Sequence, residues 1–210
     1  MIFNKEMLRL YAVTDRNWVG KKTFYEQMQE ALEGGATMVQ LREKHMEHQE
    51  FVKEAKEILE LCHCYDVPLL IDDDVEVALE SGADGVHVGI EDTPVEEIRE
   101  KVPKDFIIGA TAKTVGQAKN AEKAGADYLG VGAVFPSPTK TNAIRITKEQ
   151  LKEITSSVSI PAVAIGGITE ENIDGIRGSG VSGVAVISAI FGASDIRKAT
   201  ERLKEKVEDL

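Results

Sequence analysis

The sequence predicts an α/β fold in which eight parallel strands, each followed by a helix, close into one barrel. Short apolar runs alternate with amphipathic segments along the whole 210-residue chain. The runs are continuously apolar rather than alternating, which is typical of a parallel sheet covered by helices. Four segments, beginning near Gly35, Gly82, Gly125 and Gly180, share one design: a helix ends on glycine and a short turn leads into a strand. Their spacing of about two strand–helix units favours a barrel over a doubly wound open sheet.

The eight apolar runs give the strands in chain order. They span Leu8–Val13, Met38–Leu41, Pro68–Ile71, Gly85–Val88, Phe106–Ala110, Tyr128–Val131, Ala162–Ile165 and Gly183–Ile187.

The segments between the strands carry apolar residues at helical spacing, as Phe51, Ala55, Ile58 and Cys62 do in one of them. The predicted helices span about Lys22–Glu33, His48–Cys64, Val75–Ser81, Val95–Lys101, Val115–Ala124, Lys148–Thr155, Glu170–Arg177 and Asp195–Val207. No linker or low-complexity segment divides the chain. We therefore expect residues 1–210 to form a single-domain (β/α)8 barrel, also called a TIM barrel.

Composition excludes several classes of partner. The net charge is −11, which argues against binding through bulk charge to nucleic acid or to an anionic membrane. No apolar run reaches the length of a membrane span, and the charged segment from Met1 to Arg9 does not resemble a signal peptide. The two cysteines, Cys62 and Cys64, are interpreted as reduced thiols, in keeping with a cytoplasmic location.

Polar residues that follow the strands should meet at one end of the barrel, where such folds place their active sites. Four cations from three loops, in a net-acidic chain, favour a clamp for a di- or polyphosphate over scattered surface charge: Arg42, Lys44, Lys113 and Lys140. Asp72, Asp73 and Asp92 lie at neighbouring strand ends, where carboxylates beside a phosphate clamp suggest Mg²⁺. The competing role for the aspartates is helix capping, which explains Asp74 better than Asp72.

A second anion site is expected after the last two strands. Gly166, Gly167 and Ser188 stand where many barrels bind a phosphate monoester through backbone N–H groups, although an ordinary turn would also use glycines. The sixth strand ends in the stretch Gly130–Lys140, whose two prolines stiffen a loop that presents Ser137, Thr139 and Lys140. His87 ends a strand and has two open interpretations, a packed histidine or a ligand contact.

At these residues the chain resembles the thiamine-phosphate synthase family over essentially its whole length. The matching motifs are Leu10–Asp15, Val39–Lys44, Ala83–Gly89 with Asp92, Gly130–Lys140, Ala164–Ile168 and Ile187–Ile190. The resemblance implies a transferase that displaces pyrophosphate from hydroxymethylpyrimidine diphosphate with the nitrogen of a thiazole phosphate carboxylate. Its products are thiamine phosphate, CO₂ and pyrophosphate, and its substitution is largely dissociative.

The resemblance also implies a role for each site residue. The catalytic cations would be Arg42, Lys44 and Lys140, and the ligands of a Mg²⁺ cofactor would be Asp73 and Asp92. The pyrimidine diphosphate would be bound by Gln40, Leu41, Arg42, Glu43, Lys44, Asp72, Thr111 and Lys140, with Gln40 orienting the aminopyrimidine. The thiazole phosphate would be bound by Ser137, Pro138, Thr139, Gly167, Ile187 and Ser188.

Three positions depart from the family pattern. The family usually has Asn at the position of Asp72 and Ser at that of Thr111, and its loop is often richer in Pro and Gly than Thr141–Ile146. One alternative function is that of a thiazole tautomerase, a relative on the same barrel, and Asp73, Asp92, Arg42 and Lys44 argue against it. A more distant alternative is a phosphosugar isomerase or epimerase, which would need an acid/base pair in place of a diphosphate clamp. A non-catalytic thiamine-binding protein would not need the metal ligands. The expected partners are small-molecule substrates, and the residues leave open whether the chain forms a homo-oligomer.

Overall fold

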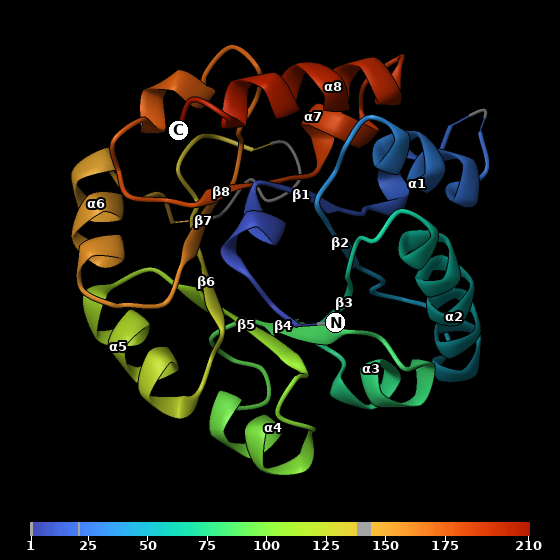
Figure 1. Cartoon of the computed structure of the whole chain (residues 1–210), viewed down its shortest axis with the longest axis horizontal. Coiled ribbons are helices and arrows are strands. Elements are labelled where there is room, and N and C mark those ends of the chain that lie inside the picture. The colour runs from blue at the N-terminus through green and yellow to red at the C-terminus, as the bar shows by residue number, and fades with distance from the viewer. Residues whose placement is uncertain (1, 21, 138–143) are drawn as a thin grey trace.

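The barrel predicted from the sequence is confirmed. The structure is a computed structural model that describes residues 2–20, 22–137 and 144–210. Within these ranges eight parallel strands pair in chain order, and the last returns to pair with the first, so that the sheet has no open edge (Figure 1). The strands are β1 (Leu10–Val13), β2 (Met38–Leu41), β3 (Leu69–Asp72), β4 (Gly85–Val88), β5 (Ile107–Ala112), β6 (Tyr128–Gly132), β7 (Ala162–Ile165) and β8 (Gly183–Val186).

The helices form a ring around the strands (Figure 1). They are α1 (Phe24–Glu33), α2 (His48–Cys64), α3 (Val75–Ser81), α4 (Val95–Lys101), α5 (Val115–Ala124), α6 (Lys148–Ser156), α7 (Ser188–Phe191) and α8 (Ile196–Val207), with short 3-10 helices η1 (Lys5–Leu8), η2 (Arg16–Trp18) and η3 (Ile173–Ile176). Among the helices of the described ranges, none is both long enough and apolar enough to cross a membrane.

The strands bury both of their faces, as their continuous apolar runs predicted. Alternate residues point outward, such as Leu10 and Ala12, and pack in a large core against the helices. The residues between them point inward, such as Tyr11, and form a separate cluster inside the barrel with Met38 and Tyr128. Side chains therefore fill the barrel, and a ligand can enter only from one of its ends.

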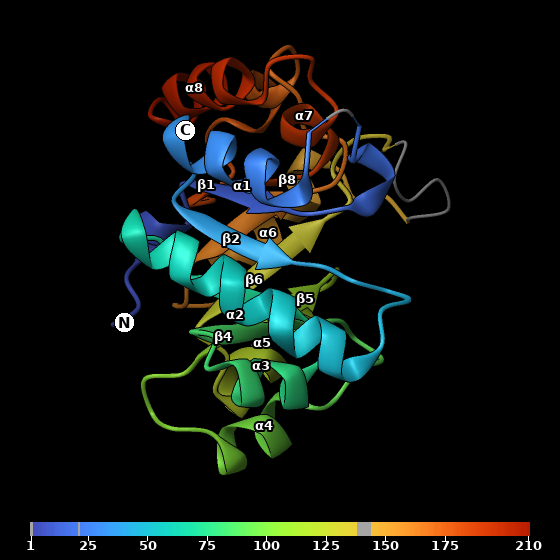
Figure 2. The same ribbon diagram turned by 90° about the vertical axis from the view of Figure 1, so that its right-hand side faces the viewer.

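The N-terminal segment covers the end of the barrel that lies opposite the strand arrowheads (Figure 2). Leu8 is fully buried in the inner cluster, and Phe3 and Met7 pack against that cluster. Leu8 belongs to η1 and β1 begins only at Leu10, so the first predicted strand was two residues too long. The covered end leaves the carboxyl ends of the strands as the open end.

The predicted helix Glu170–Arg177 is largely replaced by the short η3. Gly175 lies within the segment and weakens a helix by about 1 kcal/mol relative to alanine. The side chain of Asn172 accepts from the backbone N–H of Thr169 at 2.8 Å and donates to the carbonyl of Gly167 at 2.8 Å. These local bonds compete with helical ones, and they tie the segment to the loop after β7. The sequence also failed to predict α7.

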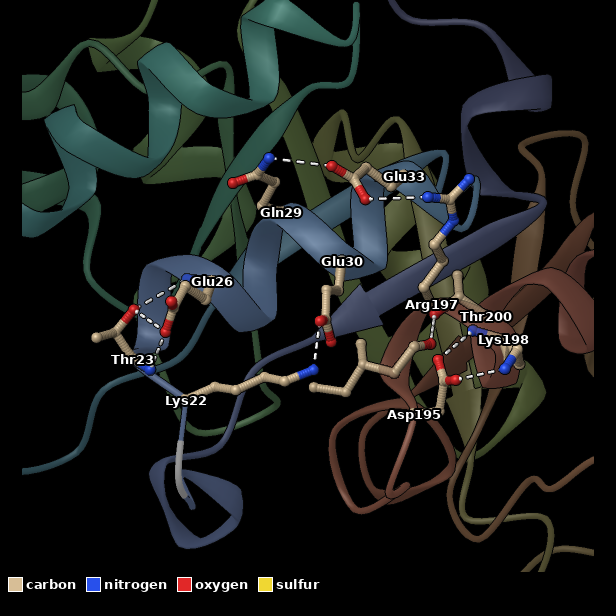
Figure 3. A network of polar contacts seen from close by, with 11 residues as sticks. Lys22, Thr23, Glu26, Gln29, Glu30, Glu33, Asp195, Arg197, Lys198 and Thr200 are labelled. Carbon is tan, nitrogen blue, oxygen red and sulfur yellow. Dashed lines mark hydrogen bonds and ion pairs between the residues drawn. The ribbon is translucent and has the colours of Figure 1, made fainter.

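Helix α1 packs closely against α8, which closes the ring between the two ends of the chain (Figure 3). A Cβ atom at Gly34 would lie 2.6 Å from both the carbonyl oxygen of Arg197 and Cβ of Thr200, so this approach requires glycine. Arg197 also reaches across the seam to Glu33, with 3.4 Å between nitrogen and oxygen. The view also shows the caps of the two helices, with Thr23 at the start of α1 and Asp195 at the start of α8.

Candidate active site

A cavity of about 510 Å³ lies at the carboxyl ends of the strands. Residues on or just after all eight strands line it, as expected for this fold. They are Val13, Gln40, Arg42, Asp72, Asp73, His87, Gly89, Ile90, Glu91, Asp92, Thr111, Lys113, Gly132, Ala133, Ser137, Ile165 to Ile168 and Ala185 to Ser188. Closure of the barrel therefore brings together residues that lie up to 175 positions apart in the chain, from Val13 to Ser188.

One wall of the cavity pairs cations with aspartates. The Nζ atom of Lys44 lies 2.9 Å from Oδ2 of Asp72 and 2.5 Å from Oδ2 of Asp73. Arg42 lies 2.9 Å from Asp15 and 3.5 Å from Asp72. Burial and the charge of Asp73 raise the pKa of Asp72, while Lys44 and Arg42 oppose this rise. Asp72 therefore balances two of the predicted catalytic cations.

The predicted metal ligands, Asp73 and Asp92, lie on the same wall. Burial raises the pKa of Asp92, and a hydrogen bond with the carboxylate of Asp73 raises it further. For Asp73, burial acts in the same direction, but hydrogen bonds with Lys44 and Asp92 outweigh it and lower the pKa. Each of these carboxyl groups therefore shifts the pKa of the other.

The residues of this pair suit Mg²⁺. Oxygen ligands from one or two carboxylates, completed by substrate phosphates and water, are what Mg²⁺ usually takes in proteins. Asp73 has a φ angle of +63°, which is uncommon for a residue other than glycine. Its backbone N–H donates to the carbonyl of His87 at 2.9 Å, so the neighbouring strand β4 holds this conformation in place. The described residues contain no group of three or more His, Cys, Asp or Glu that could hold a metal ion. The remaining ligands of a metal on Asp73 and Asp92 would therefore be substrate phosphates and water.

The loops after β6, β7 and β8 build another wall. Ser137, Gly167, Ile187 and Ser188, all predicted to bind a thiazole phosphate, line the cavity together. Gly166 and Gly167 have φ angles of +97° and +66°, in the left-handed region that favours glycine. A Cβ atom at Gly167 would lie 2.1 Å from the carbonyl oxygen of Pro136, so the two loops touch through their backbones. Pro138, Thr139 and Lys140 lie outside the described residues.

Some predicted site residues lie elsewhere. Leu41 is fully buried in the outer core against the helices, so only its backbone can face the cavity. Glu43 turns away from the cavity toward Arg16, with 2.7 Å between Oε1 and Nε, and burial raises the pKa of its carboxyl group against the charge of Arg16. Lys44 is absent from the described residues that line the cavity and reaches the site through the two aspartates.

A buried chain of hydrogen bonds beneath the cavity was not predicted from the sequence. Gln40 donates from Nε2 to the hydroxyl of Tyr11 at 2.8 Å, and the hydroxyls of Tyr11 and Tyr128 are 2.9 Å apart. The hydroxyl of Tyr128 lies 2.9 Å from Nδ1 of His87, and Nε2 of His87 lies 3.1 Å from Oγ1 of Thr111. The inward positions of Tyr11 and Tyr128 could have been found from strand alternation, but their pairing across the barrel could not.

A family model described as thiamine monophosphate synthase matches residues 10–190. The chain belongs to this family. It is 47% identical over 206 residues to the thiamine-phosphate synthase of Pyrococcus abyssi, covering 98% of each protein. It is 44% identical over 207 residues to thiamine-phosphate synthase 2 of Streptococcus pneumoniae, covering 99% of each.

A solved structure supports the same assignment. The thiamine phosphate pyrophosphorylase from Pyrococcus furiosus superimposes with a TM-score of 0.90 at 46% sequence identity, covering 97% of each chain. The family resemblance seen in the motifs therefore extends over nearly the whole chain.

Proposed function

We propose that this chain is a thiamine-phosphate synthase, a transferase of thiamine biosynthesis. One observation supports this most strongly: a single cavity joins a wall of carboxylates and cations to a wall of glycines and hydroxyls. The first wall suits a diphosphate with its metal, and the second suits a phosphate monoester. The two substrates would be hydroxymethylpyrimidine diphosphate and a thiazole phosphate carboxylate, held in contact by the shared cavity.

In the proposed reaction the bond between the pyrimidine methylene and the diphosphate oxygen breaks, and the thiazole nitrogen forms a bond to the methylene. CO₂ leaves the thiazole carbon, which then takes up a proton. Negative charge develops on the departing pyrophosphate, so cations fixed beside it lower the barrier. In this proposal Arg42, Lys44 and Lys140 would be those cations.

Asp73 and Asp92 are the residues that would hold Mg²⁺, which supplies positive charge to the diphosphate oxygens when bound. Asp73 is placed for this by β4, and Asp92 by the N–H of Gly89, which donates to its Oδ2 at 2.7 Å. Lys44 would exchange its contacts with Asp72 and Asp73 for contacts with the diphosphate. Gln40 would orient the aminopyrimidine, and Gly167, Ile187, Ser188 and Ser137 would bind the thiazole phosphate. A cytoplasmic location belongs to the same proposal.

The test is direct. The purified protein with Mg²⁺ and both substrates should form thiamine phosphate and pyrophosphate in equal amounts, and chelation of the metal should stop the reaction. The tautomerase alternative predicts a different result, in which the protein isomerises the thiazole carboxylate and forms no thiamine phosphate. That result would overturn the proposal.

A further inference from the structure

The buried hydrogen-bond chain connects two residues that line the cavity from different strands. We call it the relay: Gln40 on β2, Tyr11 on β1, Tyr128 on β6, His87 on β4 and Thr111 on β5. Gln40 and Thr111, its two ends, line the cavity, whereas Tyr11 and Tyr128 are buried beneath it with 1% and 0% of their surface exposed. The relay therefore gives two ligand-facing groups a direct connection through the barrel interior.

The neighbouring backbone leaves room for the centre of the relay. A Cβ atom at Gly109 would lie 2.2 Å from Cζ of Tyr128 and 2.5 Å from Nδ1 of His87. A Cβ atom at Gly130 would lie 2.9 Å from Cε1 of His87. Two strands thus lack a side chain where Tyr128 meets His87, and this contact could not form if either strand carried one there.

The relay has a direction, because each of its hydroxyl groups has one proton to donate. Burial raises the pKa of both tyrosines, so each keeps that proton. If Tyr128 donates to Nδ1 of His87, then Tyr11 must donate to Tyr128 and must itself accept from Gln40. A neutral His87 then carries its proton on Nε2 and donates to Thr111. The opposite order reverses every bond and also turns the Gln40 amide around.

The two orders present opposite groups to the cavity. In the first, Gln40 uses its N–H on Tyr11 and keeps its carbonyl oxygen for a ligand, while Thr111 accepts from His87 and keeps its own proton to donate. In the second, Gln40 offers N–H groups, and Thr111 can only accept. The first order suits an amino group at Gln40 and an anion at Thr111, and these are the two polar parts of an aminopyrimidine diphosphate.

We propose that the relay couples the Gln40 amide to the Thr111 hydroxyl, so that the cavity selects a ring with an amino donor and at the same time offers a hydroxyl proton to its phosphate. This proposal rests on the proposed function for the identity of the ring. Tyr11 and Tyr128 act as positioning residues, since they reach the ligand through Gln40 and Thr111, whereas His87 itself lines the cavity and links Tyr128 to Thr111. The specificity for the amino group is then a property of five residues.

The first test compares two substrates in the Tyr128→Phe variant. The 4-oxo analogue of the pyrimidine diphosphate presents an acceptor where the substrate presents the amino donor. Without the Tyr128 hydroxyl, Tyr11 can donate to Gln40 as well as accept from it, and the amide loses its fixed orientation. We expect the preference in kcat/KM for the amino substrate over the oxo analogue to fall by about tenfold. Tyr25→Phe removes the hydroxyl of a half-exposed tyrosine on α1 and should leave the preference unchanged. Equal losses for both substrates in Tyr128→Phe would overturn the proposal.

The second test needs no turnover and uses the wild-type protein. Nitrogen-15 NMR of His87, identified by comparison with His87→Gln, reports which ring nitrogen carries the proton. With the free aminopyrimidine alcohol and inorganic pyrophosphate as probes, we expect a neutral ring protonated on Nε2. A ring protonated on Nδ1, or on both nitrogens, would overturn the relay. Failure of the wild-type protein to form thiamine phosphate would instead count against the proposed function, and this measurement would still decide the relay.

Discussion

The tight contact between the loops after β6 and β7 makes Gly167→Ala the most informative single substitution. The φ angle of +66° costs a residue with a Cβ atom about 1–2 kcal/mol. The new atom would also lie 2.1 Å from the carbonyl oxygen of Pro136 and 2.6 Å from that of Phe135. Both neighbours are backbone atoms, so the two loops must separate. The loss of stability should exceed the conformational cost alone by about 1 kcal/mol or more.

Gly178 provides a matched control. Its φ angle of +72° is nearly the same, but a Cβ atom there would meet no other atom within 4 Å. Gly178→Ala should therefore show only the conformational cost. The difference in the free energy of unfolding between the two variants, measured by urea denaturation, isolates the contact between the loops.

The same pair of variants tests the wall of glycines and hydroxyls that is proposed to bind the thiazole phosphate. Because separation of the loops would displace Gly167 and Ser137 together, Gly167→Ala should raise KM for the thiazole phosphate severalfold or more. KM for the pyrimidine diphosphate should change little, and Gly178→Ala should leave both values unchanged. Equal losses of stability in the two variants, with an unaltered KM for the thiazole phosphate, would refute the reasoning.

Two further substitutions test the wall of carboxylates and cations, and a third tests Glu43, which turns away from the cavity toward Arg16. Asp73→Ala should reduce kcat far more than Asp74→Ala. Asp74 caps α3 by accepting from the N–H of Val77, so its loss should cost only about 1 kcal/mol of stability. Equal losses of rate would reject Asp73 as a metal ligand. Asp72→Asn should leave kcat/KM equal or higher, because it removes a carboxylate that competes with the diphosphate for cations, and a loss above tenfold would show that this carboxylate assists the reaction. Burial raises the pKa of the Glu43 carboxyl group in the folded protein above its ordinary value of 4.5. The protonated carboxyl group therefore contributes to the free energy of unfolding below pH 4.5, and this contribution is lost as the pH rises through the pKa of the folded protein. Glu43→Gln should remove this part of the pH dependence of unfolding and leave the stability at pH 7 equal or higher, with kcat/KM unchanged. A lower stability at pH 7 would contradict the direction of the pKa shift.

The fold could be predicted from the sequence because each strand–helix unit of a parallel barrel leaves a recognisable pattern in it. Continuous apolar runs identified the strands, and the glycines at positions 35, 82, 125 and 180 all adopt the positive φ angles expected after a helix. Once the topology is known, the residues after the strands must meet. Asp72, Asp92 and Ser188 could therefore be assigned to one cavity before the structure was known.

Directions of side chains were harder to predict. Arg42, Glu43 and Lys44 are consecutive, yet the first lines the cavity, the second turns to Arg16, and the third reaches the aspartates. Each choice depends on partners supplied by distant segments, which periodicity within one segment does not reveal. The relay illustrates the same limit, since its central contact joins Tyr11 to a residue 117 positions away.

The charges in and beside the cavity explain why a metal belongs to the proposed function. Arg42, Lys44 and Lys113 contribute three positive charges, whereas Asp15, Asp72, Asp73, Glu91 and Asp92 contribute up to five negative ones. These described residues alone do not attract a diphosphate, because the carboxylates already balance their cations. A divalent cation on Asp73 and Asp92 would offset this excess of negative charge and would release Lys44 for the substrate. The carboxylates would thus make diphosphate binding depend on the metal, so that the protein would bind the magnesium complex of its substrate in preference to the free anion.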